Sequence, residues 1–177
     1  MFERKPGVIM KLVIAGVILI VAGWILFIVM SCGDYERELR VQLLYRTDHQ
    51  ALLEACRELS TRVGKRELKP GMYRIRAARD PIVSRFPRII VDLAPSYVVV
   101  DEDGRITVEM LGGTDHFGVK AYPRNYRKPA FADFTYGDKE LCDGLWYYDD
   151  GYKELGADYE KRIEALRPRG DSGVNLE

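Results

Sequence analysis

The chain has little histidine, little cysteine and no excess of either charge. Its 177 residues include 2 histidines and 3 cysteines, and 27 basic residues balance 27 acidic ones. An odd cysteine count without C-x-x-C spacing argues against a structural zinc site and a dense disulfide framework. Because a chain without net charge has no electrostatic reason to bind nucleic acid, we expect no nucleic-acid partner.

The common motifs of catalysis and nucleotide binding are also absent. The sequence contains no G-x-S-x-G, Walker A, H-E-x-x-H or G-x-G-x-x-G pattern. Its five serines stand in no recognisable nucleophile setting, and no structural unit repeats along the chain. The motifs therefore predict neither a reaction nor a cofactor.

Charge is missing altogether from one long segment near the N-terminus. Residues 12–30 contain no charged side chain, and thirteen of these nineteen residues are Leu, Ile, Val or Phe. A helix of this length covers about 28 Å, close to the hydrocarbon thickness of a bilayer. The composition predicts a single transmembrane helix, with the lipid bilayer as a partner.

Three outcomes for this segment stay open. A retained signal anchor is favoured because Arg4, Lys5 and Lys11 precede it, against two basic residues in the ten positions that follow. This excess favours a cytoplasmic N-terminus and an extracytoplasmic C-terminal domain. Residues 29–32 resemble a bacterial lipobox, which would make Cys32 a lipidation site. Ordinary signal-peptide cleavage is the third outcome.

Small residues repeat within the same segment. Ala15-Gly16 and Ala22-Gly23 are seven positions apart, so they lie along one side of a helix. A second helix can approach closely at such a side. The pattern indicates self-association of the protein through these four residues.

The remainder of the chain has the length of one domain with its own core. Apolar residues at helical spacing predict helices at about 48–63, with Thr47 and Gln50 as a capping box, and at about 157–166. Between them, β-branched runs and turn residues predict a mainly antiparallel sheet. The expected strands cover residues 72–75, 88–93, 97–101, 105–111, 116–122 and 146–148.

The predicted fold class is therefore α+β: an N-terminal transmembrane helix followed by one small domain with a mainly antiparallel sheet and two helices. The predicted segments are a cytoplasmic tail at 1–11, the transmembrane helix at 12–30 and a juxtamembrane linker at 31–46. An α+β ectodomain at 47–168 and a flexible tail at 169–177 follow.

Both histidines follow an identical Thr-Asp pair. The two segments are Thr47-Asp48-His49 and Thr114-Asp115-His116. If the fold joined them, they would form a metal site or an acid/base pair with Asp48, His49, Asp115 and His116 as catalytic residues. Helix capping and a turn explain the same residues without any chemistry, and this explanation is favoured.

Aromatic and acidic residues interleave between positions 131 and 152. Stacking rings and carboxylates would suit a groove for a glycan or peptide, whereas the alternative is that the rings complete the core. The candidate ligand-binding residues are Trp146, Tyr147, Tyr148, Asp149 and Asp150. Cys56 is expected in the core, and a Cys56–Cys142 disulfide stays open.

These observations favour a single-pass, membrane-anchored protein of the cell envelope that binds a partner or assists an assembly. One alternative is a membrane-tethered hydrolase or metal-dependent enzyme that uses the Asp–His pairs. The other alternative is a glycan-binding module.

Overall fold

The computed structural model describes residues 6–75, 81–111, 116–126, 138–152 and 158–168. Within the long N-terminal helix, it describes the side chains of residues 14–24 and 33–41. The chain divides into two compact units, Met1–Glu38 and Leu39–Glu177. The predicted tail at 169–177 and the candidate residue Asp115 lie outside the described residues.

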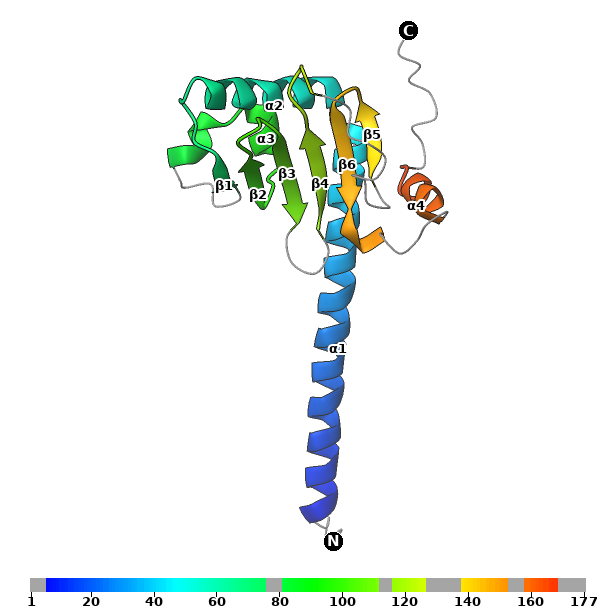
Figure 1. The fold of residues 1–177 in the computed structure, drawn as a ribbon. Helices are drawn as coiled ribbons and strands as arrows, with labels where there is room; N and C mark the ends of the chain where they lie inside the picture. The colour runs from blue at the N-terminus through cyan, green and yellow to red at the C-terminus, as the bar shows by residue number, and fades with distance from the viewer. Residues whose placement is uncertain (1–5, 76–80, 112–115, 127–137, 153–157, 169–177) are drawn as a thin grey trace. The chain divides into compact units, whose positions relative to one another are not determined.

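Helix α1 runs from Pro6 to Val41, and a π-helical turn, η1, follows at Gln42–Arg46 (Figure 1). Among the described residues, no helix has an apolar stretch long enough to cross a membrane. The prediction of a transmembrane helix at 12–30 is therefore wrong. Residues 31–46, predicted as a juxtamembrane linker, are helical: α1 continues to Val41, and η1 covers Gln42–Arg46.

A six-stranded antiparallel sheet forms the centre of the unit Leu39–Glu177, in the order β1-β2-β3-β4-β6-β5 (Figure 1). The antiparallel sheet predicted from the sequence is confirmed. Strand β5 was not predicted, because four residues in a segment rich in turns carry little periodicity. The strands are β1 (Gly71–Arg74), β2 (Tyr97–Val100), β3 (Ile106–Leu111), β4 (Phe117–Ala121), β5 (Lys139–Cys142) and β6 (Leu145–Asp149).

The hairpin between β2 and β3 follows from its turn residues. The backbone N–H of Asp101 donates to the carbonyl of Arg105 at 2.9 Å, and Gly104 has a φ of +83°. Glycine accepts this left-handed conformation without steric cost. Along β3, Ile106, Val108 and Met110 are buried while the residues between them are half-buried, as the alternating sequence predicts.

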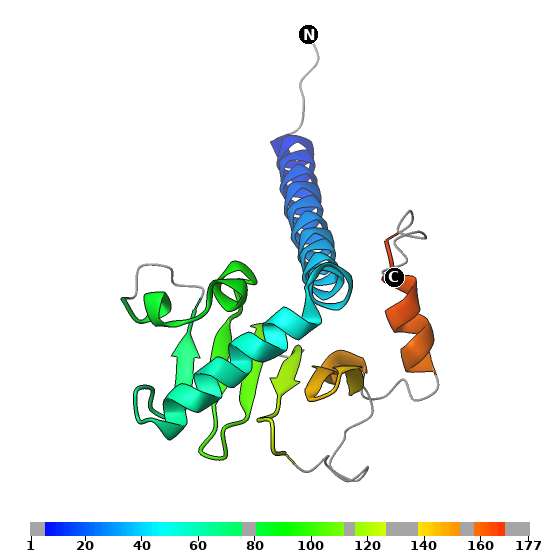
Figure 2. The ribbon, with the colours of Figure 1, turned by 90° about the horizontal axis from the view of Figure 1, so that it is seen from above.

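Helix α2 (His49–Gly64) lies across one face of the sheet and contacts β3, β4 and β5 (Figure 2). The predicted cap needs correction, since Asp48 is the N-cap and accepts from the N–H of Ala51 at 2.9 Å. Thr47 donates its hydroxyl to the carbonyl of Gln42 instead. The apolar face of α2 buries Leu52, Leu53, Ala55, Cys56 and Leu59 in the core.

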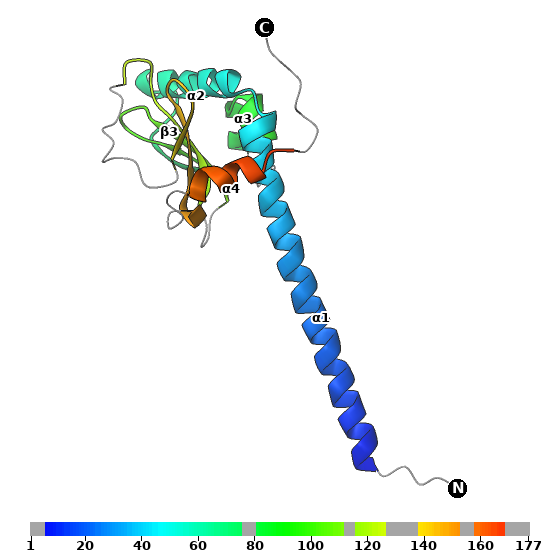
Figure 3. The ribbon, with the colours of Figure 1, turned by 90° about the vertical axis from the view of Figure 1, so that its right-hand side faces the viewer.

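Among the described residues, this unit also contains three shorter helical segments and helix α4. Residues 88–93, predicted as a strand, form helix α3 (Arg88–Asp92), so that prediction is wrong. Pro87 begins this turn, since its carbonyl accepts from the N–H of Ile90 at 3.0 Å. Turns η2 (Pro81–Arg85) and η4 (Asp150–Tyr152) are 3-10 helices. Helix α4 (Tyr159–Ala165) adjoins η1, where the Tyr45 hydroxyl donates to the carbonyl of Ile163 at 2.6 Å (Figure 3).

Candidate functional site

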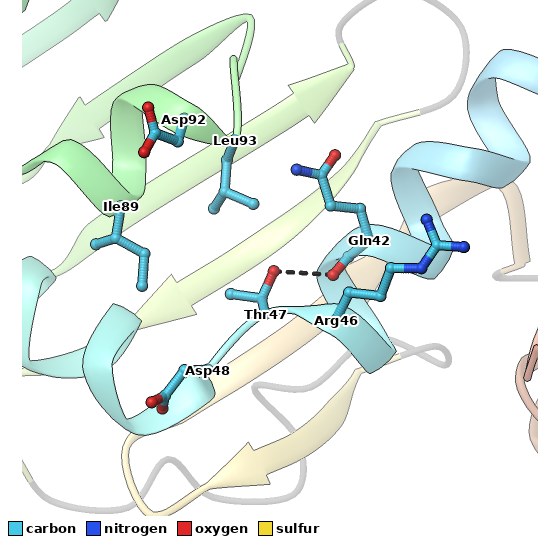
Figure 4. Close-up of a pocket in the computed structure, with 7 residues that line it drawn as sticks. All are labelled: Gln42, Arg46, Thr47, Asp48, Ile89, Asp92 and Leu93. Atoms are coloured by element: carbon cyan, nitrogen blue, oxygen red, sulfur yellow. Dashed lines mark hydrogen bonds between the residues drawn. The ribbon is translucent and has the colours of Figure 1, made fainter. Parts of the chain in front are cut away.

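A hollow of about 330 Å³ opens between η1, the start of α2 and α3 (Figure 4). Two segments that are distant in sequence form it: one ends at Asp48, the N-cap of α2, and the other covers residues 89–93. Its lining residues are Gln42, Arg46, Thr47, Asp48, Ile89, Asp92 and Leu93. This volume lies in the range of small-molecule sites.

Local hydrogen bonds hold the walls of the hollow in place. The Thr47 hydroxyl donates to the carbonyl of Gln42 at 2.8 Å, which closes the end of the π-helical turn (Figure 4). One carboxylate oxygen of Asp48 caps α2. Asp92 pairs with Arg88 at 3.5 Å on the exposed surface of α3. Leu93 is only 4% exposed and supplies an apolar surface.

Sequence reasoning named two of the lining residues, Thr47 and Asp48, and assigned them other roles. The other five lining residues carry no motif, and the two segments meet only because α3 packs near η1. A π-helical turn has no clear sequence signature, although such turns occur frequently at functional sites. The rest of this hollow was therefore not predictable from sequence.

The two histidines do not come together. The carbonyl of His49 lies 3.8 Å from the Cys142 thiol, and Cys142 and Ala121 are both register partners of Leu145. His49 thus adjoins the Ala121 end of β4, whereas His116 precedes the opposite end. Five residues of strand separate these ends by about 16 Å. The two-histidine site is not formed, and the described residues contain no group of three His, Cys, Asp or Glu side chains that could hold a metal ion.

His116 has a carboxylate partner that sequence reasoning missed. Its Nδ1 lies 2.7 Å from Oε1 of Glu109 on the neighbouring strand β3, and the two side chains are 43% and 14% exposed. Glu109 lies seven positions before His116, and the register of β3 with β4, in which Glu109 pairs with Gly118, brings the two side chains together. Such a pair can fix the tautomer of the imidazole. His49 instead contacts the carbonyl of Leu43 through Nε2 at 2.9 Å.

The aromatic strand β6 is buried rather than open. Trp146, Tyr147 and Tyr148 are 9%, 0% and 7% exposed. Burial raises the pKa of the Tyr148 hydroxyl well above its ordinary value, and the charge of Glu109 adds to this effect. Ring stacking on a glycan needs accessible faces. These rings therefore offer no glycan platform, and Asp150 begins η4, where its N–H donates to the carbonyl of His116 at 2.7 Å.

Asp149 has a structural role in the core. Its carboxylate accepts from Nε of Arg40 at 2.8 Å, from the Tyr147 hydroxyl at 2.6 Å and from the N–H of Gly151 at 3.1 Å. The Arg40 guanidinium also lies 4.2 Å from the centre of the Phe117 ring. Because donors within the protein already bind this carboxylate, Asp149 is not available to a ligand.

Both described cysteines are free thiols, so Cys56 and Cys142 form no disulfide. Complete burial raises the pKa of the Cys56 thiol to about 12. Burial also raises the pKa of Cys142, which lies less deeply. The side chain of Cys32, the predicted lipidation site, lies outside the described residues.

No known protein family, curated protein or solved structure matches this chain. Its function is therefore inferred from the geometry of its own residues.

Helix α1 exposes apolar side chains along residues 14–24. Gly16 and Gly23 have open space around them, because a Cβ added at either position would meet no atom within 4 Å. Ala15 and Ala22 are exposed as well. The exposed large side chains, which are 51% to 73% accessible, are Ile14, Val17, Ile18, Leu19, Ile20, Val21 and Trp24.

Proposed function

We propose that this protein is an assembly module whose helix α1 associates with α1 of a second copy. The observation that carries the proposal is the continuous exposure of apolar side chains along residues 14–24. Large contiguous apolar patches on a protein surface mark interaction sites, since water contact with them is unfavourable. Pairing of α1 would bring two copies of the α+β unit Leu39–Glu177 into one assembly.

The free energy gained by burying these side chains is similar to the free energy that association of two helices costs. Burying a fully exposed aliphatic side chain contributes about 1.5–3 kcal/mol, so two helices that each bury three gain at most roughly 9–18 kcal/mol. Loss of translational and rotational freedom costs about 4–15 kcal/mol. Because the gain and the cost are similar, close packing between the helices decides whether the pair is stable.

The small residues supply that close packing. At about 100° per residue, Ala15, Gly16, Ala22 and Gly23 share one side of α1, and Val17 and Val21 lie on the opposite side. Two helix backbones approach most closely where the side chains between them are small. The seven-residue spacing also keeps this side facing a partner helix over successive turns. We therefore place the contact on the side of Gly16 and Gly23.

The test compares two double variants of the full chain. Gly16→Leu with Gly23→Leu fills the proposed contact, and Val17→Leu with Val21→Leu adds bulk to the opposite side as a matched control. Sedimentation equilibrium and chemical crosslinking are measured in buffer with and without a neutral detergent. We expect a dimer whose Kd rises about tenfold or more in the glycine variant, a loss of roughly 1.4 kcal/mol, and hardly changes in the control.

Three results would overturn the proposal. One is a monomer at every concentration, and another is equal dimerisation of both double variants. The third is flotation of the monomer with phosphatidylcholine vesicles, which would assign the exposed side chains to lipid contact. Circular dichroism confirms that each variant keeps its helix content.

A further inference from the structure

We propose that the β1 edge of the sheet binds the surface of an anionic lipid membrane. This surface of the protein is named the basic edge, and it comprises Arg62, Lys65, Arg66, Lys69, Arg74 and Arg85. All six residues lie in the unit Leu39–Glu177, so the inference is separate from the assembly contact proposed on α1. Two features support it: clustered positive charge and one exposed apolar side chain beside that charge.

Positive charge is concentrated at this edge although the chain as a whole has no net charge. Residues 62–88 contain nine basic and two acidic residues, so the rest of the chain has 18 basic against 25 acidic ones. The described part of this segment contains a single acidic residue, Glu67. The neutrality of the whole chain therefore conceals a local excess of positive charge, which attracts anions.

Contacts between three segments bring the basic residues together. The guanidinium of Arg62, in the last turn of α2, donates to the carbonyl of Arg85, and Arg85 donates to the carbonyl of Glu67. The hydroxyl of Tyr73 on β1 donates to the carbonyl of Lys69. Figure 2 shows the end of α2, β1 and η2 gathered at the same edge of the sheet. The basic edge is therefore one surface of the fold.

Most of these side chains are available to a ligand. Lys65, Arg66 and Lys69 are exposed, and their side chains form no ion pair within the described part of the chain. The dipole of α2 explains cations near its C-terminus, but this effect ends within the last turn. It does not explain Lys69 and Arg74, which follow the end of the helix at Gly64 by five and ten positions.

One apolar side chain at the basic edge indicates that the anion is a lipid surface. Met72 on β1 is 64% exposed, and among the described residues it is the only large apolar side chain of the unit Leu39–Glu177 that is exposed. Met72 and Arg74 lie on the same face of the strand, two positions apart. At a membrane interface, Lys and Arg contact the anionic head groups while an apolar side chain enters the layer below them. A nucleic acid would leave Met72 in water.

The number of charges at the basic edge is sufficient for such binding. Clusters of about four to eight Lys and Arg residues are typical of segments that bind anionic lipids, and each charge near the surface strengthens binding about fivefold. The attraction acts over a Debye length of about 8 Å at physiological salt. Because the contact is made at the head groups, it needs no segment that crosses the bilayer.

The test measures flotation of the full chain with vesicles of two compositions. One is phosphatidylcholine alone, and the other contains equal parts of phosphatidylcholine and phosphatidylserine. We expect binding to the anionic vesicles alone, with release at about 1 M salt, where the Debye length falls to about 3 Å. Equal binding to both compositions, or binding to neither, would overturn the proposal. The preference for anionic vesicles can be measured whether the chain is a monomer or a dimer, so its failure is distinct from a failure of α1 association.

Two matched double variants locate the binding surface. Lys65→Gln with Arg66→Gln should weaken binding to the anionic vesicles about 25-fold, since each charge contributes about fivefold. Lys161→Gln with Arg162→Gln removes the same two charges from exposed positions on α4 and serves as the control. Urea denaturation confirms that both variants fold. Equal losses of affinity in the two double variants would refute the assignment to the basic edge.

A Met72 variant distinguishes a lipid surface from a nucleic acid. Met72→Ser keeps every charge, and loss of the apolar contact should weaken binding to the anionic vesicles about tenfold. Binding of duplex DNA, measured by fluorescence anisotropy, is the comparison. Tighter binding of DNA than of the anionic vesicles would assign the basic edge to nucleic acid and overturn the proposal. Full affinity of Met72→Ser for the vesicles would contradict it as well.

Discussion

Arg40 and Asp149 form an ion pair inside the hydrophobic core, with Nε and Oδ2 2.8 Å apart and the two residues 6% and 2% exposed. They are 109 positions apart in the sequence. The pair joins the last turn of α1 to the end of strand β6, and Tyr147 donates a further hydrogen bond to the same carboxylate oxygen. Removal of one partner would leave the other charge buried.

The first prediction concerns this pair. Arg40→Ala should lower the free energy of unfolding by about 3–5 kcal/mol, because Asp149 would then be buried without its cation. Urea denaturation followed by circular dichroism measures the change. Arg88→Ala is the control, since Arg88 and Asp92 are 3.5 Å apart with side chains 91% and 64% exposed. An exposed pair contributes about 0–1 kcal/mol. Equal losses in the two variants would show that Arg40 has no special role.

Stability should also fall at alkaline pH because of Cys56. Burial raises its pKa from 9.0 to about 12 in the folded protein. Since the folded pKa lies above the unfolded one, the thiol contributes its full stability below about pH 9. That contribution is lost as the pH rises from 9 towards 12, when only the unfolded chain releases the proton. Buried Tyr147 and Tyr148 act in the same direction at higher pH, because their pKa values are raised as well.

A cysteine variant isolates this effect. Cys56→Ala should be less stable than the native protein at about pH 8, because it leaves a small cavity. The difference should shrink by an amount on the order of 1 kcal/mol or more at about pH 11, since the variant has no thiol to ionise. Urea denaturation in reducing buffer at both values measures it. Cys142→Ala, whose thiol is less buried, should show a smaller change, and a constant difference for Cys56→Ala would contradict the assignment.

Much of the fold was predictable because its local patterns are strong. The alternation along β3 and the turn residues around Gly104 define a hairpin, and apolar spacing defines α2. The strand prediction for residues 88–93 was wrong because a short Ile- and Val-rich run fits a strand or a buried helical turn equally well. The transmembrane prediction used the length and the composition of residues 12–30, and the described helices do not support it.

The candidate sites were harder to predict because they depend on tertiary contacts. Glu109 is the partner of His116 through strand register, and no pattern joins Arg40 to Asp149. The Asp-His repeats suggested a shared site, but His49 and His116 adjoin opposite ends of β4. Trp146 and Tyr148 were candidate ligand-binding residues because aromatic rings can stack on a ligand. Whether the rings are exposed depends on the tertiary packing over them, which the sequence pattern does not give.

The sequence prediction and the structure differ at the N-terminal cap of α2. The predicted capping box assigns the cap to Thr47 with Gln50, whereas in the structure Asp48 accepts from the N–H of Ala51 at 2.9 Å. Asp48→Ala should therefore lower the free energy of unfolding by about 0.5–2 kcal/mol. Gln50→Ala should change it by less than about 0.5 kcal/mol, because exposed Gln50 makes only a 3.5 Å contact with Glu54. Chemical denaturation of both variants decides the point, since a capping box would give Gln50→Ala the larger loss.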